Sequence, residues 1–117
     1  MPTSELDDEV RRALPLKHRE FLMLLALVGG RSHGYALKQE VHRRTDGRVN
    51  LGPGTLYRTL RSLEESGLIA ETTERPADDD PRRRYYAITE LGRRVAAAEA
   101  RRLESLVSEA RTGRLIS

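Results

Sequence analysis

Residues 51–69, LGPGTLYRTLRSLEESGLI, constrain the fold most strongly, because they predict one short amphipathic helix. Leu56, Leu60 and Leu63 recur at helical spacing and form a narrow apolar stripe. Pro53 suits the first helical turn, and Gly67 suits the left-handed residue just past the end. The opposite face and its flanks carry small, hydrogen-bonding and charged residues: Gly54, Thr55, Tyr57, Arg58, Arg61, Ser62 and Glu65. Most of these side chains are of the kind that fits a DNA major groove.

The composition sets the limits within which this helix must function. The 117 residues are enough for one domain with a real core. Charged residues make up 33% of the chain, and no apolar run approaches the roughly 20 residues that a membrane span needs. The chain has no cysteine, which excludes disulfides and thiolate metal sites. Its acidic N-terminus does not resemble a signal peptide, so we expect a cytoplasmic protein without a membrane partner.

The positive charge is concentrated around the central helix. The net charge of +3 is modest, but between His42 and Arg61 there are five arginines and a single carboxylate, Asp46. These arginines are Arg43, Arg44, Arg48, Arg58 and Arg61. A local excess of this kind favours a polyanionic partner.

Three helices are expected before the central one. Residues 4–14 carry Leu6 and Val10 at helical spacing and a capping-box pattern from Ser4 to Asp7. This segment is either a frayed tail or a helix that packs on a partner subunit. Residues 17–28 predict a buried core helix, and residues 32–45 predict a second helix with Tyr35, Leu37 and Val41 facing inward. This second helix, a short connection and the central helix make a helix-turn-helix.

The hydrophobic period changes from 3.6 to 2 after Gly67. Residues 68–74 and 83–88 predict two strands joined by a charged, turn-forming loop, which adds a wing to the helix-turn-helix. Thr89 is then expected to cap a last helix that runs to about Arg111. Its stripe of apolar residues follows a heptad pattern: Ala96, Ala100, Leu103, Val107 and Ala110. A helix that projects past a small core leaves such a stripe exposed, so we expect it, with Leu6 and Val10, to pair with a second copy.

These elements predict an α+β fold, mainly α, of the winged helix-turn-helix type with a C-terminal dimerisation helix. We expect an N-terminal extension over residues 1–16 and a DNA-binding domain over residues 17–88. Residues 89–117 then form the dimerisation helix and tail.

Four strings of residues make a family resemblance specific. They are HGYAL at residues 33–37, GPGTLYRTL at residues 52–60, LEESGLI at residues 63–69 and RYYAITELG at residues 84–92. In this order and spacing, across residues 17–94, the chain resembles the PadR family of transcriptional regulators, and its length resembles the short subfamily with one C-terminal helix. The resemblance implies a homodimeric repressor that binds a double-stranded DNA operator and is released by a small-molecule effector. Some relatives hold flat drugs between aromatic residues at the dimer centre, but the last helix here carries only Ala, Leu and Val on that stripe.

The resemblance also implies roles for individual residues. The recognition helix presents Gly54, Thr55, Tyr57, Arg58 and Arg61. Arg58 and Arg61 are candidates for base or phosphate contacts, whereas Gly54 and Thr55 suit a phosphate or a close approach to the groove. Tyr57 either donates to a phosphate or is half-buried against the wing. Three residues lie where the preceding helix would cross the DNA backbone: His33, Tyr35 (which packing explains equally well) and Lys38. In the wing, Arg75, Arg82 and Arg84 at the base are candidates for phosphate contacts, whereas Asp78, Asp79 and Asp80 at the tip would repel phosphates.

Other functions have weaker support. His33 and His42 do not share a helix face, and no zinc-ligand spacing occurs, so we expect no metal. No nucleophile elbow or phosphate-binding loop is present, so we expect neither catalytic residues nor a cofactor. The main alternative to a repressor is a winged helix that binds a protein partner instead of DNA.

Overall fold

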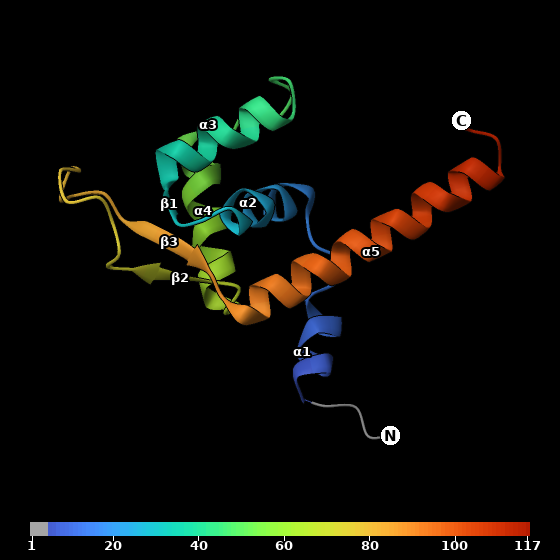
Figure 1. Cartoon of the computed structure of the whole chain (residues 1–117), viewed down its shortest axis with the longest axis horizontal. Coiled ribbons are helices and arrows are strands. Elements are labelled where there is room, and N and C mark those ends of the chain that lie inside the picture. Colours follow the sequence, from blue (N-terminus) through green and yellow to red (C-terminus); the bar gives the residue numbers. More distant parts are fainter. Residues whose placement is uncertain (1–4) are drawn as a thin grey trace.

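The computed structural model describes residues 5–117, which form a mainly helical domain with one small antiparallel sheet (Figure 1). The elements are α1 (Glu5–Ala13), α2 (His18–Val28), β1 (Ser32–His33), α3 (Gly34–Arg44), α4 (Pro53–Glu65), β2 (Ile69–Thr72), β3 (Tyr85–Ile88) and α5 (Glu90–Thr112). Helices α3 and α4 form the helix-turn-helix, and β2 and β3 form the wing. The expected winged helix-turn-helix fold is therefore confirmed.

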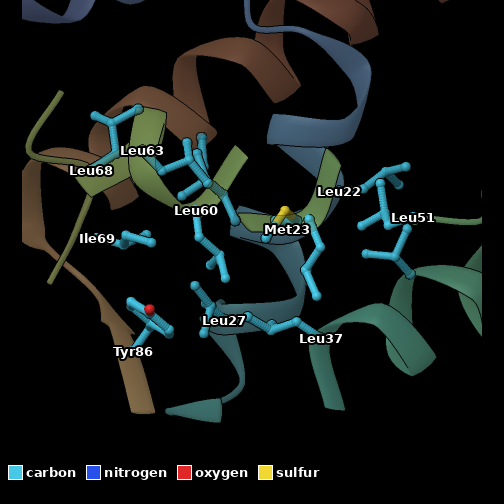
Figure 2. Packing of buried hydrophobic residues seen from close by; sticks show 14 of the residues in the cluster. Leu22, Met23, Leu27, Leu37, Leu51, Leu60, Leu63, Leu68, Ile69 and Tyr86 are labelled. Carbon is cyan, nitrogen blue, oxygen red and sulfur yellow. The ribbon is translucent and has the colours of Figure 1, made fainter. Parts of the chain in front are cut away.

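The core forms where α2, α3 and α4 meet the sheet (Figure 2). Met23 and Leu24 of α2 are completely buried, as expected for a helix that is apolar nearly all round. The apolar stripe predicted for α4 is also buried, with its three leucines between 0% and 4% exposed. This burial holds α4 in one orientation and leaves its polar face in solvent.

The boundaries of α4 follow from its terminal residues. Gly52 is the N-cap and Pro53 occupies the first turn, where its missing N–H leaves no donor unpaired. After the C-cap at Ser66, Gly67 has a φ of 75°, the left-handed conformation expected from the sequence. The N–H of Gly67 donates to the carbonyl of Glu64 at 2.9 Å, so the chain leaves the helix in a fixed direction toward the wing.

The sheet contains a strand that the sequence analysis did not predict. Residues 32 and 33 were expected to begin the second helix, but they form β1, and α3 starts only at Gly34. β1 pairs antiparallel with β3, with Ser32 opposite Tyr86 and His33 opposite Tyr85. β3 is therefore the central strand, in the order β1-β3-β2. This pairing attaches the wing to the start of α3.

The wing strands are shorter than the sequence pattern suggested. They cover residues 69–72 and 85–88, so residues 73–84 all belong to the loop between them. The alternating pattern of the sequence extends into both ends of the loop. The residues there are held by side-chain interactions rather than by backbone pairing between strands.

Helix α1 is not a frayed tail between Glu5 and Ala13, which corrects one of the two alternatives for this segment. It packs against α5 of the same chain, where Val10 contacts the edge of the core and Leu6 is half-buried. The expected Ser4 cap lies outside the described residues. Glu99 of α5, only 2% exposed, fixes the following linker because its Oε1 accepts the N–H of Leu16 at 3.2 Å.

Helix α5 begins as predicted, since the Thr89 hydroxyl accepts the N–H of Gly92 at 3.0 Å. Its first turns are buried, whereas its second half projects away from the domain, opposite the wing loop (Figure 1). Ala96 was expected at the surface for dimerisation, but it is 5% exposed and belongs to the core of its own chain. Between residues 5 and 117, no helix is both long enough and apolar enough to cross a membrane.

Candidate nucleic-acid interface

The exposed face of α4 presents two unpaired cations. Arg58 and Arg61 are exposed and form no ion pair within residues 5–117. Arg58 donates to the hydroxyl of Thr55 at 3.3 Å, one turn earlier on the helix. Gly54 is exposed beside them and Thr55 is half-buried. The predicted recognition-helix residues therefore lie together on the solvent side of α4.

Two tyrosines stand out from the surface next to this face. Tyr57 of α4 is 61% exposed, and Tyr35 of α3 is 59% exposed. The expectation that Tyr35 faces inward is wrong, because the inward side of α3 is formed by Leu37 and Val41, both buried. Half-burial of Tyr57 against the wing is likewise not what the structure shows. Both phenols are accessible to a partner.

The start of α3 is capped by a histidine. His33 Nδ1 accepts the N–H of Ala36 at 3.3 Å, which requires an unprotonated nitrogen. Burial lowers the pKa of His33 from its usual 6.5, and the nearby Arg83 and Arg75 lower it further, whereas Asp79 opposes the shift. Lys38, also predicted to face DNA, lies one turn into α3 and is half-buried.

A hollow of about 340 Å³ separates α3 and α4 from the wing. Its walls come from all three elements: His33, Gly34, Tyr35, Tyr57, Arg82, Arg83, Arg84 and Tyr86. The structure thus brings together five of the predicted binding residues: His33, Tyr35, Tyr57, Arg82 and Arg84. Cationic and phenolic groups around one concave surface suit an anionic partner such as a phosphate backbone.

Arg83 is a member of this hollow that the sequence analysis missed. The sequence analysis selected Arg82 and Arg84 as phosphate contacts but not Arg83, whereas in the structure all three precede β3 and line the hollow. Arg84 has the longest ion pair of the wing cations in the described residues, since its Nε lies 3.9 Å from a Glu71 oxygen. In the sequence, the run of three arginines at residues 82–84 was the signal that could have identified Arg83.

Arg75 faces the interior of the loop rather than solvent. Its guanidinium donates to the carbonyls of Asp80 and Arg83 and lies over the ring of Tyr85, 5.2 Å from the centroid. Only 24% of its side chain is exposed. This position argues against the predicted phosphate contact of Arg75, because two of its guanidinium N–H groups are already used within the loop.

The charge count around α4 also needs correction. Glu40, just before the segment counted in the sequence, pairs with Arg44 at 2.7 Å and also with the adjacent Arg43. These two arginines hold the pKa of Glu40 at about 2. The positive field of the α3 C-terminus is therefore partly neutralised, and Arg58 and Arg61 contribute a larger share of the free charge.

A second hollow, of about 200 Å³, lies between the start of α2 and α4. Lys17, Arg19 and Arg58 supply positive charge there, and Glu20 lies 3.5 Å from the Ser62 hydroxyl. The sequence analysis did not select Lys17 or Arg19, since they lie at the start of the core helix and are far from residues 51–69 in sequence. Within residues 5–117, no three His, Asp or Glu side chains gather as a metal site would require.

The sequence can now be compared with known proteins. The model of the transcriptional regulator PadR-like family matches residues 22–98, which is most of the chain. This chain belongs to the PadR-like family. The match runs from within α2 through the wing into the first turns of α5. It includes every residue that lines the hollow beside the wing, whereas Lys17, Arg19 and Glu20 of the second hollow precede it.

The relatives of this PadR-like protein agree with that assignment. The transcriptional regulator Rv3488 of Mycobacterium tuberculosis is 39% identical over 77 residues, covering 66% of this chain and 67% of the relative. An uncharacterized 37.1 kDa protein in transposon TN4556 of Streptomyces fradiae is 34% identical over 87 residues, covering 74% of this chain but only 23% of the relative. A PadR family transcription regulator from Clostridium difficile R20291 has the same fold, with a TM-score of 0.72 and 21% identity over 82% of this chain and 97% of that one.

The PadR-like family is one of transcriptional regulators rather than enzymes. Among the described residues, the family match leaves out residues 5–21, which hold α1 and the start of α2, and residues 99–117, which hold the second half of α5 and the tail. A hollow of about 620 Å³ lies between α1 and α5, lined by Asp7 and Val10 of α1 and by Glu90, Arg93, Arg94, Ala97 and Arg101 of α5.

Proposed function

We propose that this PadR-like protein is a homodimeric repressor that binds a double-stranded DNA operator through α4 and the wing. The observation that supports it best is the hollow beside α4, where Tyr35, Tyr57 and three wing arginines surround one concave surface. In this proposal residues 17–88 bind DNA, and residues 89–117 with the 1–16 extension hold two copies together. Operator DNA lies in the cytoplasm of the bacterial relatives, where we expect the protein to act.

The recognition step uses the free cations of α4. With α4 in the major groove, Arg58 and Arg61 reach base edges or the adjacent phosphates, and a bidentate arginine–guanine contact discriminates by about 1–3 kcal/mol. The start of α4 has no Cβ at Gly54, which lets its backbone approach the groove. Phosphates on one side of the groove then face the hollow, where Tyr57 and Arg84 are available as donors.

The second half of α5 supports the dimer. Val107 is 40% exposed and Leu106 is 48% exposed on a helix that extends beyond its own core. Pairing of two such helices would place two copies of α4 in successive major grooves, with half-sites about 34 Å apart. The expected dimerisation residues that remain accessible are Ala100, Leu103, Val107 and Ala110, together with part of Leu6 and Val10.

The hollow between α1 and α5 is where we place a small-molecule effector. It adjoins both the proposed dimer helix α5 and the N-terminal helix α1. A ligand bound there would favour one spacing of the two domains, and release of DNA requires only that this spacing differ from the operator spacing. Its walls carry three arginines and two carboxylates, Asp7 and Glu90, and this excess of one positive charge favours an anionic effector.

One observation favours a different function, that of a protein-interaction module. Tyr35 and Tyr57 are both about 60% exposed, and exposed aromatic side chains are typical anchors of protein interfaces. The salt dependence of binding separates the two functions, because phosphate contacts release counterions and most protein contacts do not.

The test is fluorescence anisotropy with labelled DNA from upstream of the gene and with a scrambled duplex, each at two salt concentrations. We expect tighter binding to the native duplex and a steep loss of affinity with salt. Arg58→Ala should weaken binding and either relax specificity at one base pair or reduce the salt slope by about one.

Arg43→Ala is the matched control, since it removes the same charge from a residue that already pairs with Glu40. Its effect on DNA affinity should be clearly smaller than that of Arg58→Ala. Weak binding to both duplexes with little salt dependence would reject the repressor and favour the protein-interaction module.

A further inference from the structure

The wing loop, residues 73–84, is closed by one carboxylate. Asp79 accepts the hydroxyl of Tyr85 on one oxygen and Nη1 of Arg83 on the other, the latter at 2.8 Å. Arg75 Nη2 lies 3.7 Å from the same carboxylate. Although it sits in a surface loop, the Asp79 side chain is only 14% exposed. Three donors from both flanks of the loop therefore converge on it.

Arg75 closes the loop from the other side. Its guanidinium donates to the carbonyls of Asp80 and Arg83 and lies over the Tyr85 ring. The fork of the guanidinium can hold two carbonyls at once, which a lysine cannot do. Asp79, Arg75 and Tyr85 together are called the wing clasp below.

The wing clasp is anchored to the helix-turn-helix. The Tyr85 ring meets His33 edge to face, with centroids 5.3 Å apart and planes at 78°. The same two residues pair across β1 and β3. His33 in turn caps α3, so the position of the loop is fixed relative to the start of that helix.

The three acidic residues at the wing tip differ in their surroundings. Asp80 binds Arg82, with its Oδ1 accepting the backbone N–H at 2.9 Å. Asp78 is exposed and, within residues 5–117, forms no ion pair or side-chain hydrogen bond. Of these three acidic residues, only Asp79 contacts both flanks of the loop through its side chain. A simple charge argument treats all three as repulsive to phosphates, but the contacts separate Asp79 from Asp78.

We propose that Asp79 is a positioning residue for DNA binding, because the wing clasp holds the loop in the conformation that presents Arg82, Arg83 and Arg84 to the hollow beside α4. The inference rests on the proposed function. A loop that is already ordered loses little conformational entropy when it binds, whereas an open loop must be ordered at the expense of affinity. The Tyr85 hydroxyl also keeps the pKa of Asp79 below its usual value, so the carboxylate stays charged at neutral pH.

The test compares Asp79→Asn with Asp78→Asn, which remove the same charge at adjacent positions. Anisotropy is measured with labelled duplex from upstream of the gene over a range of salt concentrations. Asp78→Asn should bind as tightly as the wild type or more tightly, because a repulsive charge is lost. Asp79→Asn should bind roughly tenfold more weakly, the effect of having to order one or two loop residues. Its salt slope should also fall, since fewer phosphates are contacted, and a purely structural role would not change that slope.

A second measurement requires no DNA. Trypsin should cut the loop after Arg82, Arg83 or Arg84 several times faster in Asp79→Asn than in Asp78→Asn or the wild type, under conditions where all three remain folded by thermal denaturation. Tyr85→Phe keeps the ring on His33 and removes only the hydroxyl, so it should resemble Asp79→Asn in both measurements.

The two proposals fail in different ways. If Asp79→Asn binds DNA as tightly as Asp78→Asn, or if its loop stays as resistant to trypsin as that of the wild type, the positioning role is rejected. If the wild type itself shows no salt-sensitive DNA binding, the proposed function fails and Asp79 has no role in DNA binding. In that case trypsin still measures whether the wing clasp closes the loop.

Discussion

Two glycines lie in opposite surroundings: Gly92 is tightly packed, whereas Gly54 is exposed. A Cβ on Gly92 would lie 2.0 Å from the carbonyl oxygen of Leu68 and 2.8 Å from Cγ1 of Ile88. The backbone of α5 touches the backbone before β2 at this point, so no side-chain movement relieves the overlap. A Cβ on Gly54 would meet only the end of the Arg58 side chain, at 3.2 Å.

These positions give opposite predictions for substitution by alanine. Gly92→Ala should destabilise the protein by about 1–3 kcal/mol, because the start of α5 must move away from the sheet. Gly54→Ala should leave stability unchanged or raise it by up to about 1 kcal/mol, since alanine is the better helix former. Urea denaturation of the two variants and the wild type measures both effects.

For DNA affinity we expect the opposite order from stability, with the larger effect in Gly54→Ala. If the backbone at the start of α4 approaches the groove closely, Gly54→Ala weakens operator binding although the protein is fully folded. Equal affinity of Gly54→Ala and the wild type in anisotropy would show that Gly54 does not lie at a close approach.

The outward orientation of Tyr35 could have been predicted from the sequence, but the pattern analysis overlooked it. Tyr35 lies two positions before Leu37, and residues two apart on a helix point to nearly opposite sides. With Leu37 and Val41 inward, Tyr35 must therefore face solvent, as it does. The wing clasp, in contrast, could not be predicted, because the contacts of Asp79 depend on how a loop of twelve residues closes, and no local period encodes that closure.

At the scale of elements, the long helices were predictable and the shortest strand was not. α2 is a long apolar run, the helical period of α4 and α5 repeats over several turns, and Pro53, Gly67 and Thr89 mark boundaries through local backbone chemistry. β1 has two residues and therefore no period, and it is defined by pairing with Tyr85 and Tyr86, far along the chain. Its formation shortens α3 by two residues and makes His33 both a strand residue and a helix cap.

The junction of β1 and α3 should respond to pH. The pKa of His33 is lower in the folded protein than the usual 6.5, first through burial and then through Arg83. The unfolded chain therefore binds the proton more readily, and stability rises with pH. The contribution of neutral His33 is fully present above about pH 6.5 and is lost as the pH falls through the lower folded-state value.

His33→Asn tests this, because asparagine also caps helices through an oxygen acceptor but does not titrate. The free energy of unfolding of the wild type relative to His33→Asn should fall as the pH is lowered from about 8 to about 5. Parallel pH profiles for the two proteins would contradict the assignment of the titrating group to His33.

At the scale of the whole molecule, the chain is more extended than its length requires. Its radius of gyration is 15.9 Å, whereas a compact domain of this length has about 13 Å. The excess comes from α5, which projects on the side away from the wing (Figure 1). A single copy thus leaves Leu106 and Val107, and also Leu115 and Ile116 of the tail, exposed by 40–81%. Exposed apolar residues grouped on one projecting element mark an interaction surface.

The proposed homodimer can be tested by placing a charge in that surface. Val107→Glu should convert the protein from dimer to monomer in analytical ultracentrifugation, because a buried unpaired carboxylate is costly at an apolar helix interface. Ser105→Glu is the matched control, since Ser105 is exposed and lies two positions away, on nearly the opposite side of α5. Both substitutions add one negative charge to the same helix, so only the position differs.

The monomeric variant should keep its fold and its weak binding to one half-site, but it should lose the added affinity for two half-sites about 34 Å apart. A wild type that sediments as a monomer at high concentration, or a Val107→Glu variant that remains a dimer, would show that this stripe does not join two copies.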